Sequence, residues 1–157
     1  MEKMKFRGHE TFFIRKGWLN KGIRNILKDP YVFMGVNGNP SDILGLGTNM
    51  VKSLRYWLQV VGLTKEKIVT KKMQELTDVG KIINDNDPYM EEIGTLALLH
   101  YFLGTNRENA TAWYFFFNVF KNIEFTKEEL KTQLKNYANI YGVEVADRVL
   151  EDDCNCI

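Results

Sequence analysis

The 157-residue sequence contains only two cysteines and three prolines. Cys154 and Cys156 are too few for a disulfide framework, and two thiolates supply only half of a tetrahedral zinc site. No apolar run approaches the roughly 18 residues that cross a bilayer, and the N-terminus lacks the apolar core of a signal peptide. These absences favour a cytoplasmic protein that has no membrane segment and binds no metal.

The chain also lacks a large excess of charge of either sign, since its formal net charge is +1. Its charges are nevertheless segregated. Residues 1–29 carry eight Lys or Arg against three Asp or Glu, and residues 48–72 carry six against Glu66 alone, whereas residues 121–157 have a net charge of −3. Such segregation can create a basic face for phosphate on a nearly neutral protein. The alternative is that the lysines only solvate surface loops.

Hydrophobic residues are abundant at 45%, and aromatic residues make up 13% of the chain. This composition excludes disorder and predicts a well-packed interior. No phosphate-binding glycine loop, nucleophile elbow or paired zinc motif is present. We therefore expect no cofactor.

The segment LGLGTNMVKSLRYWLQVV at residues 44–61 predicts a helix-turn-helix. A short helix at Ser41–Leu44 is followed by a turn at Gly45 and Gly47, and then by a second helix capped by Thr48. One face of that helix is apolar and consists of Met50, Leu54, Trp57, Leu58 and Val61. The opposite face has no carboxylate and consists of Thr48, Asn49, Lys52, Arg55, Tyr56 and Gln59.

A second helix with such a polar face is suited to a DNA major groove, where Arg pairs with guanine and Asn with adenine. For Arg55 the alternative is a buried bond to a carboxylate, because its position flanks the apolar face. The sequence LTKEKIVTKKMQEL that follows Gly62 predicts a β-hairpin, with Thr77 as the N-cap of a short helix after it. The hairpin would be the wing, and would carry Lys65, Lys67, Lys71 and Lys72 towards the phosphate backbone.

The rest of the chain predicts helices. Residues 6–14 are expected to form an extended arm before a helix over Ile14–Lys28, which Asp29-Pro30 ends. Ile93–Leu103 and Ala112–Phe120 are apolar on nearly every side, which is typical of helices that are buried or meet a partner. A capping box at Thr126 and Glu129 begins a helix that Gly142 stops after Tyr141.

A final helix from about Val145 would bury Val145, Val149 and Cys156, and it reaches Ile157 without a stop signal. We therefore expect the polypeptide to end within an element. The predicted fold is mainly α, with an N-terminal arm and a winged helix-turn-helix domain in residues 1–86 and a packed helical region in residues 87–157.

Several segments together resemble an uncharacterised prokaryotic domain-of-unknown-function family. They are Gly8-His9-Glu10-Thr11-Phe12, Leu46-Gly47, Asn49–Trp57, Leu99-His100-Tyr101, Thr111–Tyr114 and Phe117-Asn118. Members are generally longer, and their genes often lie beside a gene related to phosphoadenosine phosphosulfate reductases, in clusters for sulfur modification of DNA or phage defence. The resemblance implies a DNA-related context but brings no established activity or catalytic residues.

Three functional hypotheses follow. The first is a DNA-binding module that uses the polar helix face and the wing lysines. The second is a protein-interaction adaptor for the neighbouring sulfur-transfer machinery, which would use an exposed apolar patch around Trp113–Phe120. In that region the aromatic run Trp113–Phe117 could also stack bases, or form a core or a dimer seam.

The third hypothesis is an enzyme or metal site that uses His9, Glu10 and His100. The simpler interpretation is that His100 is a core histidine and that Glu10 pairs with Arg7, Arg15 or Lys16. We therefore expect no catalytic residue and a binding protein whose main partner is DNA.

Overall fold

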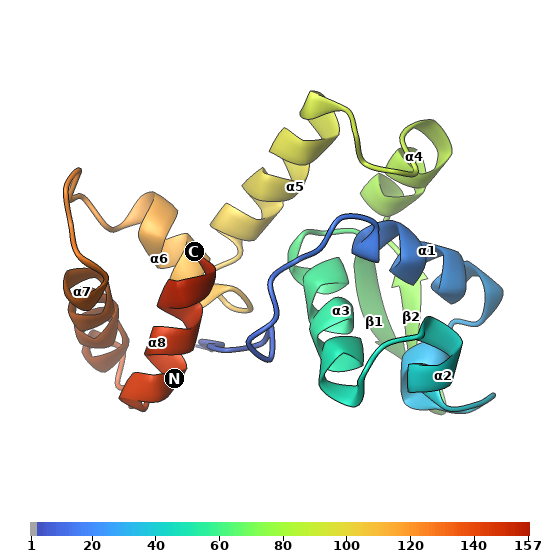
Figure 1. The fold of residues 1–157 in the computed structure, drawn as a ribbon, viewed down its shortest axis with the longest axis horizontal. Coiled ribbons are helices and arrows are strands. Elements are labelled where there is room, and N and C mark those ends of the chain that lie inside the picture. The colour runs from blue at the N-terminus through green and yellow to red at the C-terminus, as the bar shows by residue number, and fades with distance from the viewer. Residues whose placement is uncertain (1–2) are drawn as a thin grey trace.

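The computed structural model describes residues 3–157 and is mainly α-helical (Figure 1). Helices α1 (Trp18–Lys28), α2 (Pro40–Leu44) and α3 (Thr48–Val60) come first, with a short 3-10 helix at Val32–Met34 between α1 and α2. Strands β1 (Thr64–Ile68) and β2 (Lys72–Leu76) follow α3 and pair as an antiparallel hairpin. The remaining helices are α4 (Asp78–Asn86), α5 (Ile93–Thr105), α6 (Thr111–Asn118), α7 (Lys127–Ile140) and α8 (Asp147–Cys156). The predicted fold class is confirmed.

The turn between α2 and α3 follows from local sequence. Pro40 occupies the start of α2, and the Asn39 side chain accepts the Ser41 N–H at 3.0 Å. Gly45 ends α2 in the left-handed region at φ 60°, which glycine adopts without steric cost. The predicted cap of α3 is wrong, because Gly47 is the N-cap residue and Thr48 already belongs to the helix.

The hairpin pairs Thr64 with Leu76 and Ile68 with Lys72, which leaves residues 69–71 at its tip. The Thr77 hydroxyl accepts the Gly80 N–H at 2.9 Å, which confirms its prediction as the N-cap of the next helix. Helix α1 begins later than predicted, because Gly17 before it has a left-handed φ of 80° and does not continue a helical turn.

The C-terminal helices form a separate group in space. Helices α6, α7 and α8 lie on the side of the molecule opposite α1 and α2, and the N-terminal arm passes between α8 and α3 (Figure 1). The capping box of Thr126 and Glu129 is present at the start of α7, as predicted. Helix α8 buries Leu150, Asp153 and Cys154, whereas the predicted Val145, Val149 and Cys156 are only half-buried.

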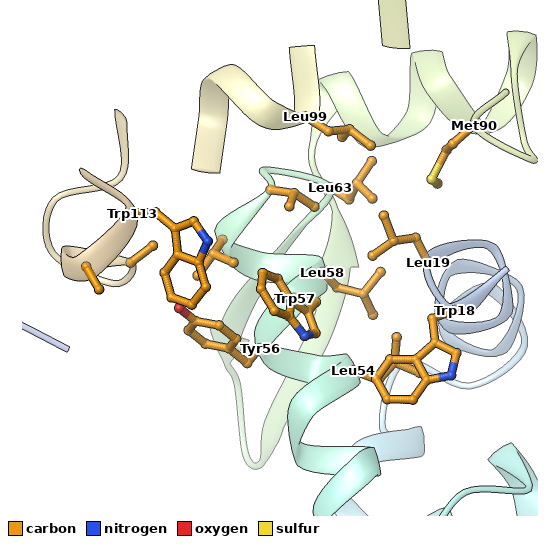
Figure 2. Packing of buried hydrophobic residues seen from close by; sticks show 14 of the residues in the cluster. Trp18, Leu19, Leu54, Tyr56, Trp57, Leu58, Leu63, Met90, Leu99 and Trp113 are labelled. Carbon is orange, nitrogen blue, oxygen red and sulfur yellow. The ribbon is translucent and has the colours of Figure 1, made fainter. Parts of the chain in front are cut away.

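One cluster of buried apolar side chains connects the two groups of helices (Figure 2). Leu54, Trp57 and Leu58 of α3 contribute to it, and the Trp57 ring meets Trp113 of α6 edge to face, with 5.5 Å between the ring centroids. Both predicted regions therefore share a core. The boundary at residue 86 stays a prediction.

The two apolar helices of the second region differ in burial. In α6, Trp113 and Phe115 are buried, as a core helix requires. In α5 only Leu99 and Gly104 are buried, whereas Ile93 is 83% and Tyr101 is 63% exposed. Most of α5 is therefore not buried, and for this helix the other expected alternative, contact with a partner, stays a prediction. Among the described residues, every helix is too short or too polar to span a bilayer.

Candidate nucleic-acid interface

The N-terminal half of α3 is the solvent-accessible part of the predicted recognition helix. Thr48, Asn49 and Lys52 are exposed, and the Lys52 ammonium donates to the Asn49 side-chain oxygen at 3.3 Å. No side chain caps this helix, and its first turn has no acidic residue. Uncapped N–H groups and the positive end of the helix dipole favour an anion. This end of α3 is therefore suited to a phosphate as well as to base edges.

The N-terminal arm covers another part of the predicted polar face. Tyr56 is only 4% exposed, so its predicted place on the outer face is wrong. Gly8 lies so close to its ring that an added Cβ would stand 2.3 Å from a ring carbon, and the Lys5 ammonium lies 5.0 Å from the ring centroid. Burial raises the pKa of the Tyr56 phenol. Periodicity within α3 could not reveal this contact, because the arm precedes α3 by about 40 residues.

Arg55 and Gln59 face the hairpin rather than solvent. The Arg55 guanidinium pairs with the Glu66 carboxylate of β1, which is the alternative considered for this residue. The Gln59 amide donates to the Gln74 side-chain oxygen at 3.3 Å, and the Gln74 amide donates to Glu66 at 3.0 Å. This network fastens the C-terminal half of α3 to the hairpin.

Glu66 is ionised within this network. Partial burial alone would raise its pKa, but hydrogen bonds and charge from Arg55 and Lys72 outweigh burial and hold the pKa of this carboxyl below its usual range. The negative charge of Glu66 therefore sits between two of the predicted DNA-binding cations and neutralises part of their charge.

The hairpin lysines are exposed, as a wing requires, but most of them already have carboxylate partners. Lys65 and Lys67 approach Glu75 at 3.2 and 4.0 Å, and Lys72 approaches Glu66 at 3.2 Å. Lys71 lies in the turn at the tip of the hairpin and makes no ion pair within residues 3–157. Exposed pairs of this kind contribute only about 0.2–1 kcal/mol, so phosphates can replace these carboxylates at small cost.

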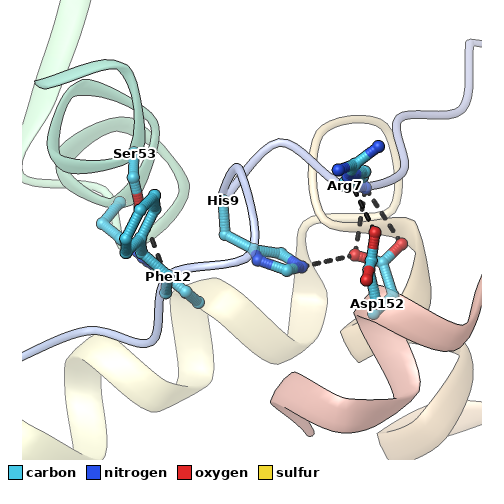
Figure 3. Close-up of polar contacts among 7 residues, drawn as sticks. Arg7, His9, Phe12, Ser53 and Asp152 are labelled. Carbon is cyan, nitrogen blue, oxygen red and sulfur yellow. Dashed lines mark hydrogen bonds and ion pairs between the residues drawn. The ribbon is translucent and has the colours of Figure 1, made fainter. Parts of the chain in front are cut away.

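The arm is anchored at both ends of its contact with the core (Figure 3). His9 is fully buried, and its Nε2 lies 2.9 Å from an oxygen of Asp153 in α8. The Arg7 backbone N–H also donates to both Asp153 oxygens at 3.0 Å, while the Phe12 carbonyl accepts the Trp57 indole N–H at 3.0 Å. The arm therefore connects α3 with α8.

Asp153 was not predicted from the sequence. Burial raises the pKa of its carboxyl, and the bonds from His9 and Arg7 oppose that shift. Leu150, Asp153 and Cys154 are spaced by three and four residues and so lie on one face of α8. That helical periodicity was the only signal in the sequence that could have indicated burial of Asp153. The pair with His9, 144 positions earlier, had no local signature.

The residues of the enzyme hypothesis do not form a common site in the contacts observed. His9 stacks on Trp57 and meets Trp113 edge to face. His100 is exposed on α5 and meets Phe117, with 4.6 Å between the two ring centroids. The prediction of a core position for His100 is therefore wrong. Glu10 makes no ion pair within residues 3–157, and Arg7 pairs with Asp152 at 2.8 Å instead.

Metal-ligating groups are also dispersed. Residues 3–157 contain no cluster of three or more His, Cys, Asp or Glu side chains that could hold a metal ion. Burial raises the pKa of the Cys154 thiol to about 11 and that of Cys156 to about 12. Both thiols are therefore protonated near neutral pH, and neither is a ready ligand or nucleophile.

The helix-turn-helix and its following hairpin define a winged-helix type of protein. The chain belongs to the family described as protein of unknown function (DUF4007), whose model matches residues 6–157. The predicted resemblance to a domain-of-unknown-function family is thereby confirmed at the level of the family.

Two solved structures are similar to the chain. A crystal structure of SspB with bound magnesium ion matches with a TM-score of 0.86 and 29% identity, over 97% of this chain and 47% of that one. A second SspB crystal structure matches with the same TM-score and 28% identity, over 97% of this chain and 48% of that one. The chain thus spans about half the length of these structures. No curated protein matches it.

Proposed function

We propose that this chain is a DNA-binding winged-helix module that serves DNA modification or phage defence. The observation that carries the proposal is the exposed N-terminal half of α3, where Thr48, Asn49 and Lys52 surround a helix end without a cap or a carboxylate. A helix end of this kind can enter a major groove and contact both bases and phosphates.

The predicted contact residues take different parts in this proposal. Asn49 and Lys52 reach base edges, and Thr48 lies at the helix end that meets phosphate. Arg55 and Gln59 position the hairpin through Glu66 and Gln74, and the buried Tyr56 makes no contact. The exposed hairpin lysines contact the phosphate backbone: Lys65, Lys67, Lys71 and Lys72.

The setting of DNA modification or defence rests on the family resemblance, whose members lie near genes for sulfur modification of DNA. We propose a binding module rather than an enzyme. In support, the buried His9 is hydrogen-bonded to Asp153, and His100 instead lies on α5 against the Phe117 ring.

A fluorescence-anisotropy titration tests the proposal. The chain is titrated against sulfur-modified and unmodified duplexes at about 50 and 200 mM salt, and its affinity should fall at least about tenfold between them. Lys52→Glu should weaken binding, whereas Lys121→Glu, the same charge change on an exposed loop before α7, should not. Absence of binding at low salt would refute the proposal.

A second candidate function is favoured by the exposed apolar surface of α5. Leu96 is 50% and Tyr101 is 63% exposed, and Phe117 of α6 is 48% exposed beside His100. Exposed apolar side chains on a surface often mark protein contacts. The partner in this candidate is the reductase-like protein implied by the family resemblance. Co-purification of the two proteins, lost on Leu96→Gln, would support an adaptor.

A further inference from the structure

The outer face of α1 carries a second group of cations. Lys21, Arg24 and Lys28 are all exposed and follow one another at spacings of three and four residues, so they lie on one face of the helix. With a rise of 1.5 Å per residue, the row is about 10 Å long. Helix α1 contains no acidic residue.

These cations are less neutralised than those of the hairpin. Within residues 3–157, Arg24 and Lys28 make no ion pair, and Lys21 donates only to the Leu44 carbonyl at 3.1 Å. Three of the four hairpin lysines, by contrast, share two glutamates. The face of α1 therefore has the more concentrated unpaired positive charge.

The row borders a shallow depression between α1 and α2, of about 400 Å³. Lys21, Arg24 and Lys28 line it together with Gly17, Asn20, Asn25 and Ile43, so no acidic residue contributes to its surface. A concave surface with only cationic and neutral groups concentrates positive potential. Such a surface favours an anion.

The position of the row relates it to α3. The Lys21 ammonium contacts the carbonyl of Leu44, the last residue of α2, and Thr48 begins α3 only four residues later. Four residues of chain span at most about 14 Å, and a major groove is about 12 Å wide. The Lys21 end of the row therefore lies within about one groove width of the exposed start of α3, close to where the phosphates at the rim of that groove would be.

We propose that Lys21, Arg24 and Lys28 form a second contact with the DNA backbone, on the phosphates that flank the groove occupied by α3. This inference rests on the proposed function. The Arg24 guanidinium is suited to bidentate phosphate bonds, and the two lysines act as point charges. The contact is independent of base sequence, because phosphates carry no sequence information.

The experiment compares the salt dependence of duplex binding among the full chain and charge variants. In the test variant Lys21, Arg24 and Lys28 are changed to Gln, and in the control Lys121, Lys135 and Arg148, exposed on the opposite group of helices, are changed to Gln. Both variants lose three positive charges. A second test variant, Arg24→Gln with Lys28→Gln, keeps the Lys21–Leu44 hydrogen bond and so protects the α2 turn.

The slope of log affinity against log salt should become shallower by about 2.7 in the triple test variant and by about 1.8 in the double variant. At low salt, affinity should fall at least tenfold for every duplex tested, while the control keeps the slope of the unchanged chain. A double test variant with an unchanged slope would overturn the inference.

The same titration separates this inference from the proposed function. If Lys52→Glu weakens binding and the α1 variants do not, the proposed contact of α3 with DNA is supported and the α1 contact is refuted. If the unchanged chain binds no DNA at low salt, both are refuted. If all of these test variants weaken binding and the control does not, both are supported.

Discussion

Helices α3 and α5 both have 13 residues, yet they relate to the core in opposite ways. Seven residues of α3 are buried, and the helix as a whole is amphipathic. In α5 only two residues are buried, although its residues are more apolar on average. Periodicity, rather than apolar content, therefore indicates how a helix meets the core of its own chain.

The burial of α3 also explains which part of it is available. Helix α1 packs on one side, the arm covers Tyr56, and the hairpin holds Arg55 and Gln59. Only the outer face of its N-terminal half remains exposed, while the inner face is buried in the core. A helix packed in this way can present Asn49 and Lys52 in defined positions.

The largest test of the contrast is a matched leucine truncation. Leu54 of α3 is fully buried, so Leu54→Ala should lower the free energy of unfolding by about 2–5 kcal/mol through lost contacts and a cavity. Leu96 of α5 is 50% exposed, so Leu96→Ala should change it by less than about 0.5 kcal/mol. Urea unfolding measures both. Equal losses would contradict the contrast.

A matched pair of glycines should give the next largest difference. An alanine Cβ at Gly8 would overlap the Tyr56 ring, so Gly8→Ala should destabilise the fold by about 1–3 kcal/mol. Gly94, in the first turn of α5, has open space around it, so Gly94→Ala should stabilise by up to about 1 kcal/mol. Thermal unfolding followed by circular dichroism resolves the opposite signs. A Gly8→Ala variant as stable as the unchanged chain would show that the arm does not pack on α3 as described.

A smaller effect should arise where α3 meets the hairpin, a link that α5 lacks. Because the folded-state pKa of Glu66 is lowered, its contribution to stability is present above its unfolded pKa of about 4.3 and is lost as the pH falls through the folded value. Glu66→Gln should therefore cost about 1 kcal/mol at pH 7 and less at pH 3.

Urea unfolding at the two pH values measures this change, with Glu144→Gln, an exposed loop residue, as the control. A cost for Glu66→Gln that is the same at both pH values would show that its ionisation does not stabilise the link between α3 and the hairpin.

The parts of the fold that could be predicted from the sequence depend on local signals. The turn at Gly45, the cap at Thr77 and the capping box at Thr126 each act over a few residues, and the structure has all three. Short-range hydrogen bonds and glycine geometry decide such features. Neighbouring residues suffice to predict these three, although the same kind of signal misplaced the cap of α3, where Gly47 and not Thr48 is the N-cap.

The features that escaped prediction depend on contacts between distant segments. The arm buries Tyr56, and the carboxylate of Asp153 meets His9 across the whole length of the chain. No local period encodes either contact. Arg55 was open to two interpretations because its helical position borders both solvent and core, and only the hairpin, which brings Glu66 to it, decides between them.

The smallest expected change in stability comes from making two exposed apolar positions of α5 polar. Leu96→Gln with Tyr101→Gln should leave the free energy of unfolding within about 0.5 kcal/mol of the unchanged chain, because both side chains already face solvent. Ile140→Gln, at a 77% exposed position on α7, is the control for a lone apolar residue.

If α5 serves a partner, the double variant alone should lose co-purification with the reductase-like protein, since removing apolar area from an interface weakens binding without weakening the fold. A loss of several kcal/mol in stability would place α5 in the core of this chain after all, and the contrast with α3 would no longer hold.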